Sequence, residues 1–305
     1  MLSDAAMDRH VCFEVPTQWE RVARSRLSGT LLVIGAPDTG KSTFARYLYR
    51  CLCAQHERVA FVDGDVGQST LGPPTTMTLA LGEPGDDSFP PAGPRFRAFV
   101  GDVSLRRHML PMVVNAHMLV RKAREEGASA VVFDTTGLVD PSHGGGALKR
   151  AKVDLLRPSV VVGIQRRSEL EHLLCPLRRS HRTRVIDLPA SRSIRRRDVS
   201  VRQDHRATRF RRYFDGARDL EIEWGRIAVF PVPDADFDHA CRVHRLAALE
   251  DNEGFTLALG IVVSSDPGRG VVALYTPIPS LLNVDAVHLG DLLWNPCTFR
   301  GVRLR

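Results

Sequence analysis

Residues 35–42 have the types and the spacing of a phosphate-binding loop. They spell Gly-Ala-Pro-Asp-Thr-Gly-Lys-Ser, which satisfies the pattern G-x-x-x-x-G-K-[ST] in full. Gly35 and Gly40 let successive backbone N–H groups point at phosphate oxygens. We expect Lys41 to reach the outer phosphates and the Ser42 hydroxyl to hold Mg²⁺. The residues expected to line this nucleoside triphosphate site are Gly35, Ala36, Pro37, Asp38, Thr39, Gly40, Lys41, Ser42 and Thr43.

A second group of polar residues follows the apolar run 58–62. Its sequence is Asp63-Gly-Asp-Val-Gly-Gln68. One carboxylate can orient Mg²⁺ through water, while the other takes a proton from an attacking hydroxyl. Gln68 can position the acceptor or the phosphate in transfer. The alternative is a strand-to-loop turn in which Asp and Gly serve turn geometry alone.

A third group, Asp134-Thr-Thr-Gly137, follows the apolar run 130–133. An aspartate after such a run is the usual magnesium-orienting carboxylate of phosphate-loop proteins. The expected metal site therefore comprises Ser42, Asp63 and Asp134. Thr135 and Thr136 can bond phosphate or nucleotide, although a turn or a helix cap would also explain them.

An arginine-rich stretch spans residues 178–212, which contain thirteen arginines and only three aspartates. Such a segment can close over a triphosphate and stabilise the charge in transfer, or it can hold a nucleic-acid backbone. Arg192 and Arg196 are four residues apart and would share one face of a helix. A solvated helix face with no specific partner is the alternative interpretation.

The elements that position these groups alternate along the chain. Apolar runs predict buried strands at 30–34, 58–62, 97–100, 130–133 and 159–164. Helical spacing predicts helices at 43–52, 110–126, 144–156 and 168–174, with a short lead-in helix after Pro16. The Gly- and Pro-rich stretch 71–95 predicts a loop. This alternation predicts an α/β fold with a mostly parallel sheet, whose polar strand ends meet at one edge.

The pattern changes at about residue 220. Short strands without intervening helices are predicted at 226–230, 255–263, 270–275 and 286–289. They predict a small β-rich C-terminal domain.

Composition narrows the class of protein further. Of the residues, 43% are hydrophobic and 25% are charged, as in globular proteins, and the net charge of +7 suits a polyanionic partner. No apolar run is long enough to cross a bilayer, and the polar N-terminus does not resemble a secretory signal. The six cysteines show neither a CxxC pair nor zinc spacing, so we expect reduced thiols in the cytoplasm and no membrane partner.

Taken together, these stretches resemble the polynucleotide 5′-hydroxyl kinases related to the kinase subunit of pre-mRNA cleavage and tRNA-splicing complexes. The resemblance covers roughly residues 15–300. The residues that carry it are 35–43, 63–68, 72–76, 134–138, the arginine segment that ends at 209–214, and 276–279 and 287–290 near the C-terminus.

The resemblance implies a P-loop NTPase fold and transfer of the ATP γ-phosphate to the 5′-hydroxyl of RNA or DNA, with Mg²⁺. It implies catalytic roles for Lys41, Asp63, Asp65 and Gln68, and for Arg192 and Arg196 in a mobile lid. One of the two aspartates would be the general base, and Asp65 is slightly favoured. The expected substrate clasp is Thr135, Thr136, Gly137 and Leu138.

The resemblance also implies a domain plan. A lead-in segment would occupy 1–28, a P-loop kinase domain 29–219 with its lid at about 190–212, and the β-rich domain 220–305. Eukaryotic members carry a β domain before the phosphate loop, which we expect this chain to lack. Their clasp ends in Trp where this chain has Leu138, which weakens base stacking worth about 1–3 kcal/mol per base.

Two other functions remain open at the level of sequence. A small-molecule kinase would use the same loop and aspartates, although a small acceptor needs few arginines. An ATP-bound scaffold for RNA-processing partners is permitted by the altered clasp, although a scaffold has no need of a general base. The sequence does not separate RNA from DNA and identifies no protein partner.

Overall fold

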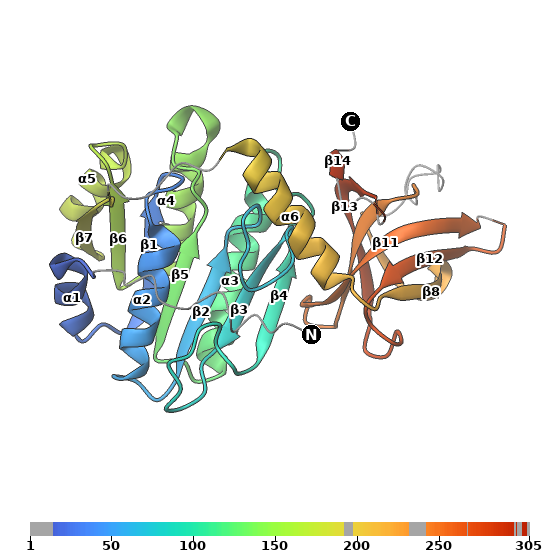
Figure 1. Ribbon diagram of the computed structural model, residues 1–305, viewed down its shortest axis with the longest axis horizontal. Helices are drawn as coiled ribbons and strands as arrows, with labels where there is room; N and C mark the ends of the chain where they lie inside the picture. The colour runs from blue at the N-terminus through green and yellow to red at the C-terminus, as the bar shows by residue number, and fades with distance from the viewer. Residues whose placement is uncertain are drawn as a thin grey trace.

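The computed structural model describes residues 15–191, 198–231, 242–266, 268–295, 297 and 301–303. These residues form two β-sheets, and helices accompany mainly the first of them (Figure 1). None of the helices in the described residues is long and apolar enough to span a membrane.

The first sheet has the strand order β4-β3-β2-β5-β1-β6-β7. Strands β2, β5, β1, β6 and β7 pair in parallel with their neighbours in this order. Strand β3 pairs antiparallel with both β2 and β4. The strands are β1 (Gly29–Gly35), β2 (Val59–Gly64), β3 (Thr76–Leu81), β4 (Arg95–Phe99), β5 (Ala130–Thr135), β6 (Val160–Gln165) and β7 (Arg184–Pro189). The α/β class and the mostly parallel sheet are thus confirmed.

Helices cover both faces of this sheet because its central strands are apolar on both sides. In β1, Leu31 and Val33 pack with α1 and α2, and Leu32 and Ile34 pack under α3, α4 and α5. The helices are α1 (Thr17–Arg24), α2 (Lys41–Cys53), α3 (Met109–Glu125), α4 (Gly145–Leu156), α5 (Glu171–Ser180) and α6 (Val199–Tyr213), with short 3₁₀ turns η2 (Pro141–His143) and η3 (Trp224–Arg226).

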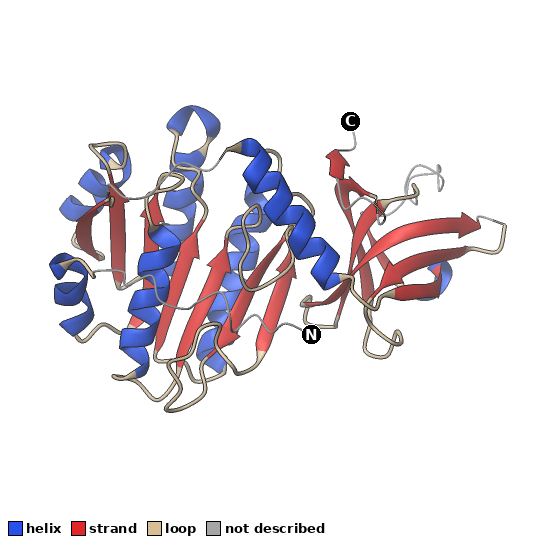
Figure 2. Cartoon of the chain, in the orientation of Figure 1, coloured by secondary structure: helices blue, strands red, loops and turns tan. Residues whose placement is uncertain are grey.

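The second sheet has the order β14-β13-β10-β11-β12-β8, with β9 paired to β13, and its pairings are antiparallel apart from that last one. Figure 2 shows it beside the helix-covered sheet. Its strands are β8 (Arg218–Glu223), β9 (Ala228–Phe230), β10 (Arg245–Glu250), β11 (Thr256–Asp266), β12 (Val271–Thr276), β13 (Ala286–Trp294) and β14 (Gly301–Arg303). The predicted β-rich C-terminal part is therefore present, while the exact domain boundaries stay a prediction.

Helix α6 connects the two sheets and contacts both (Figure 1). Its Phe210 is fully buried against Trp294 of the second sheet, at 4.2 Å between ring centroids. Phe99 at the end of β4 belongs to the same apolar cluster. The arginine-rich helix is thereby fixed at the edge where the polar strand ends meet.

The prediction of a loop throughout 71–95 was wrong at residues 76–81. These residues form β3, which pairs antiparallel with β2 and is buried along its whole length. The flanking Gly and Pro residues favoured a loop, but the sheet edge next to β2 offers an apolar site that overrides local preference. Strands β7 and β10 were not predicted either.

Candidate nucleotide and acceptor site

The phosphate loop connects β1 to α2 and is held by hydrogen bonds within itself. Gly40 has φ 91°, a left-handed conformation that favours glycine, and it directly precedes the first turn of α2. The Lys41 ammonium donates to the Ala36 carbonyl at 2.7 Å, and the Thr39 hydroxyl donates to the same carbonyl at 2.9 Å. Lys41 thus lies folded over the loop in which phosphates would bind.

Asp134 lies at the floor of this loop because β5 is the neighbour of both β1 and β2. In register, Asp134 is opposite Val33 on one side and Asp63 on the other. The Ser42 hydroxyl lies near the Asp134 carboxyl and lowers the pKa of that group. The Asp134 Oδ1 atom is buried and has no hydrogen-bond partner among the described residues. A hydroxyl beside a carboxylate with an unused oxygen is a donor set that fits Mg²⁺.

Burial is also the main cause of the raised pKa of Asp134, which lies at about 7, and the nearby Asp63 adds to it. The pKa of Lys41 is lowered by burial, although Asp134, Asp65 and Asp38 oppose that shift. A cation at the Ser42–Asp134 position would favour the ionised carboxylate.

The Asp63 carboxylate accepts hydrogen bonds from the loop that follows it. Its Oδ2 accepts hydrogen bonds from the Thr70 N–H at 2.6 Å and the Leu71 N–H at 3.0 Å. The Ser69 and Thr70 hydroxyls also donate to Oδ2, each at 3.1 Å. With four donors on one oxygen, this buried carboxylate holds the shape of the 65–71 loop.

Asp65 has a different environment from Asp63, since it is partly exposed and lines a cavity. Its Oδ1 accepts from the N–H groups of Gly67 and Gln68, at 3.1 and 3.0 Å. Burial and the neighbouring Asp63 raise its pKa, whereas Lys41 lowers it. Asp65 is therefore the aspartate of the pair that a ligand can reach.

A cavity of about 910 Å³ brings most of the predicted site together. It is bounded by the phosphate loop, by the 65–68 turn, by residues 136–140 and by α6. The predicted site residues on its wall are Ala36, Pro37, Asp38, Gly40, Lys41, Ser42, Thr43, Asp65, Gln68, Thr136, Gly137 and Leu138. The volume suits a nucleotide and part of an acceptor.

The expected clasp divides into a buried part and an exposed part. The Thr135 hydroxyl donates to the Val33 carbonyl at 2.7 Å and serves the sheet rather than the cavity. Gly137 lies against the phosphate loop, where a Cβ would come within 2.9 Å of Pro37. Leu138 lines the cavity and is half-buried, so an apolar side chain does stand at the clasp position.

The expected lid arginines Arg192 and Arg196 lie outside the described residues. The helix that follows them, α6, supplies other arginines to the site. Arg202 forms an ion pair with Asp38 of the phosphate loop at 2.8 Å, and Arg206 lines the cavity. Their spacing of four residues was visible in the sequence and signals a shared helix face.

The same helix also binds the loop that Asp63 organises. Arg209 donates to the carbonyls of Thr70 at 2.8 Å and Gly72 at 3.0 Å. Gln68 donates to the Arg202 carbonyl at 3.3 Å, while its buried Oε1 lacks a partner among the described residues. The arginine helix, the phosphate loop and the aspartate turn therefore form one connected site.

Sequence reasoning missed two fully buried lysines on α4. The Lys149 ammonium donates to the Thr136 carbonyl at 2.6 Å and to the Thr136 hydroxyl at 3.2 Å. The Lys152 nitrogen has no hydrogen-bond partner among the described residues and lies 4.9 Å from the centre of the Phe133 ring. Two lysines on the apolar face of the predicted helix were the available signal.

The fold and this site define a P-loop protein that binds nucleotide. Within that class, the chain belongs to the family described as mRNA cleavage and polyadenylation factor CLP1 P-loop, which matches residues 35–216. The resemblance inferred from the motifs is thus confirmed.

Several curated proteins are similar to this chain. The polyribonucleotide 5′-hydroxyl-kinase of Pyrococcus furiosus is 30% identical over 71% of this chain and 60% of its own length. That of Methanocaldococcus jannaschii is 29% identical over 65% of this chain and 54% of its own length. The chain thus spans little more than half of these two relatives. The Thermococcus kodakarensis protein of the same name is 26% identical over 90% of both chains.

A solved structure of a wild-type Clp1p–Pcf11p complex contains a similar fold. The TM-score is 0.66, the sequence identity is 12%, and the match covers 90% of this chain and 76% of the other. The likeness extends over both sheets of the fold.

Proposed function

We propose that this protein is a polynucleotide 5′-hydroxyl kinase that transfers the γ-phosphate of ATP to the 5′ end of RNA or DNA. One observation carries the proposal: Lys41 and the accessible Asp65 line the same cavity as Arg202 and Arg206. A phosphate-binding lysine, a candidate base and two cations around one cavity are the parts that phosphoryl transfer needs. The names of the curated relatives support the same activity and favour RNA.

In this proposal Asp65 is the general base. It accepts the proton of the 5′-hydroxyl while that oxygen forms a bond to the γ-phosphorus and the bond to the bridging oxygen of ADP breaks. Asp63 is better suited to hold the 65–71 loop, since one of its oxygens already accepts four hydrogen bonds. The raised pKa of Asp65 keeps this carboxylate a stronger base than an exposed one.

The phosphates would occupy the loop at 35–42, with Lys41 turned from the Ala36 carbonyl toward them. Ser42 and Asp134 would hold Mg²⁺, which neutralises phosphate charge when bound. Arg202 and Arg206 would stabilise the charge of the γ-phosphate in transfer, with Arg202 exchanging its Asp38 partner for phosphate. Arg192 and Arg196 remain part of the proposal as further cations of the lid.

The acceptor would enter beside Thr136, Gly137 and Leu138. Leu138 offers apolar contact to a sugar or a base without the stacking that an aromatic ring gives.

We place the protein in the cytoplasm. The only basis for this location is that Cys51, Cys53 and Cys175 are free thiols and partly buried.

The assay is transfer of labelled γ-phosphate to a 5′-hydroxyl oligonucleotide in the presence of Mg²⁺. The Lys41→Ala variant is expected to lose transfer, because no other lysine lines the described cavity. Transfer to a nucleoside but not to oligonucleotides would instead identify a small-molecule kinase. Bound ATP that survives with every acceptor would identify a scaffold.

A further inference from the structure

A groove runs between α4 and α5, away from the nucleotide cavity. It consists of three hollows that share walls. The first, of about 170 Å³, lies by Gly146, Lys149 and His172. The second, of about 290 Å³, shares Val153 and Leu177 with it. The third, of about 450 Å³, shares residues 182–183 with the second, so the three hollows are neighbours in a row.

The near end of this groove adjoins the candidate active site. Lys149 lines the first hollow and also holds Thr136, which lines the nucleotide cavity. His143 lines the cavity and lies two residues before the start of α4. The twelve residues of α4 extend the row of hollows by about 18 Å. A strand that leaves the cavity near His143 would thus meet the groove directly.

The far end of the groove is strongly basic. Arg157, Arg182 and Arg184 are exposed, and their side chains make no ion pair or hydrogen bond with the described residues. The neighbouring carboxylates are already engaged: Asp154 pairs with Arg150 at 2.7 Å. The three arginines therefore present an uncompensated positive surface.

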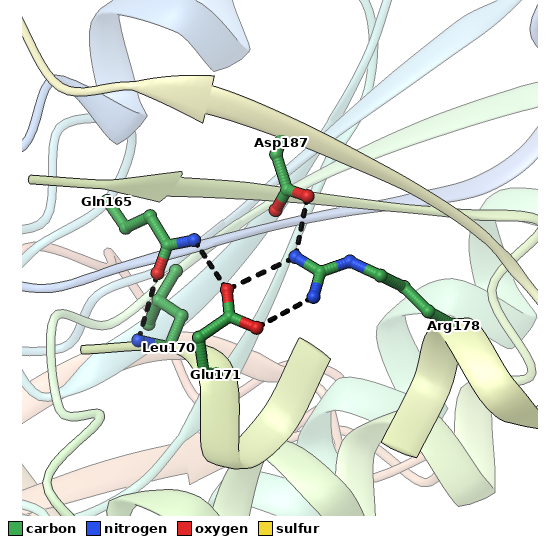
Figure 3. Close-up of polar contacts among 5 residues, drawn as sticks. All are labelled: Gln165, Leu170, Glu171, Arg178 and Asp187. Carbon is green, nitrogen blue, oxygen red and sulfur yellow. Dashed lines mark hydrogen bonds and ion pairs between the residues drawn. The ribbon is translucent and has the colours of Figure 1, made fainter. Parts of the chain in front are cut away.

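Figure 3 shows how the other nearby carboxylates are held. Arg178 bridges Glu171 of α5 at 2.7 Å and Asp187 of β7 at 2.6 Å, and Gln165 donates to Glu171 at 2.8 Å. This cluster ties α5 to the edge of the first sheet. It fixes the groove wall and leaves Arg182 and Arg184 without an acidic neighbour to pair with.

The groove floor differs from its rim in chemistry. Val153, Pro158, Pro176 and Leu177 supply apolar surface, and the Thr183 hydroxyl is buried without a partner among the described residues. Apolar surface can contact the faces of bases, while the arginines at the rim can bind backbone phosphates. No aromatic ring lines the second hollow in the described part of the chain, so it offers apolar contact without a stacking platform.

We propose that this α4–α5 groove binds the single-stranded nucleic acid that trails from the 5′ end held in the cavity, with Arg157 and Arg182 on its backbone phosphates. The proposal rests on the proposed kinase function for its choice of ligand. Binding along the groove would offset the weaker contact at Leu138. The reacting end would then be oriented by the distal strand.

The test compares a 5′-hydroxyl dinucleotide with an oligonucleotide of about ten nucleotides. The variant Arg157→Gln/Arg182→Gln removes two groove cations. The matched control Arg50→Gln/Arg269→Gln removes two exposed arginines of α2 and the β11–β12 turn, distant from the groove in sequence and fold. We expect the groove variant to raise KM for the longer acceptor by about five- to tenfold. Its kcat, its KM for the dinucleotide and both parameters of the control should not change.

Salt dependence gives an independent readout of the same contacts. For the longer oligonucleotide, the slope of log affinity against log salt should fall by about 1.4 in the groove variant, or about 0.7 for each lost phosphate contact. An unchanged KM and salt slope in the groove variant, or equal effects in the control variant, would overturn the proposal that the groove binds the strand. If the wild-type protein transfers no phosphate, the proposed function fails. The groove is then still tested by comparing how tightly wild type and the groove variant bind the same oligonucleotide.

Discussion

At the scale of residues, Asp63 and Asp65 lie two positions apart and have different environments. Asp63 is buried under four donors to one oxygen, and Asp65 faces the cavity. Sequence alone left the choice of base open because both carboxylates follow the same strand. The hydrogen bonds of the 65–71 loop give the two carboxylates different surroundings, and for that reason we propose Asp65 as the base.

Substitution of each aspartate by asparagine should separate their roles. Asp65→Asn should lower kcat by about 10²–10⁴-fold, since the general base is lost, with ATP affinity within about twofold of wild type. Asp63→Asn should lower the free energy of unfolding by about 1–3 kcal/mol, since buried donors lose a charged acceptor. Steady-state kinetics and urea denaturation measure the two effects. A larger loss of kcat in Asp63→Asn, with stability intact, would reverse the assignment.

Lys152 gives the fold a pH dependence of its own. Burial lowers its pKa from 10.5 to about 7. Between these values the unfolded chain binds a proton that the folded protein lacks, so the unfolding free energy rises with pH by about 1.4 kcal/mol per unit. Lys152→Met removes this contribution. The variant should be more stable than wild type near pH 7, by a margin that shrinks toward pH 10; a margin independent of pH would refute a neutral buried Lys152.

At the scale of elements, α6 positions the arginines through its apolar side. Phe210 is fully buried against Trp294, whereas Arg202 and Arg206 face the cavity from the same helix. The helix was visible in the sequence only as a run of arginines. Its depth of burial depends on the second sheet, which no local pattern reveals.

Shortening the buried anchor of α6 should therefore affect both stability and activity. Phe210→Ala should lower the unfolding free energy by about 3–5 kcal/mol, because it leaves a cavity, and it should reduce kcat. Val201→Ala, on the exposed side of α6, is the matched control and should change neither. Calorimetry and kinetics on the same samples measure both. Full activity in a destabilised Phe210→Ala protein would mean that α6 does not set the site.

Other elements show what local sequence does and does not determine. The strand at 30–34, the loop at 35–42 and the helix after them could be predicted because each carries its own signal. Strand β3 could not, since its burial comes from pairing with β2. Arg202 and Arg206 are four residues apart within the arginine-rich stretch, but the ion pair of Arg202 with Asp38 depends on the tertiary fold.

At the scale of the whole molecule, the two sheets are joined by polar and apolar contacts. The Asp291 N–H donates to the Gly101 carbonyl at 3.0 Å, and His108 and Asp291 form a pair at 3.1 Å. Phe99 and Phe210 share an apolar cluster with residues of the second sheet. The shared core should make unfolding cooperative across both sheets.

Single-tryptophan proteins test this cooperativity. One variant would keep only Trp19, which packs on α2, and another only Trp294 of the second sheet. In each variant, the denaturation midpoint from tryptophan fluorescence should equal the midpoint from circular dichroism. This comparison within one variant removes the effect of the tryptophan substitutions on stability. If the fluorescence midpoint of a variant differed from its circular dichroism midpoint, or if its fluorescence showed two transitions, the two sheets would unfold independently.

The proposed reaction transfers phosphate to a 5′-hydroxyl, and the position of the transferred label on the acceptor tests it. Wild-type protein, Mg²⁺ and γ-labelled ATP are incubated with the same RNA bearing either a 5′-hydroxyl or a 5′-phosphate, and the product is digested to 5′-mononucleotides. We expect label on the 5′-terminal nucleotide of the hydroxyl RNA alone, and no label with the Lys41→Ala variant. Absence of label from that nucleotide, with ATP still bound, would contradict the proposed reaction.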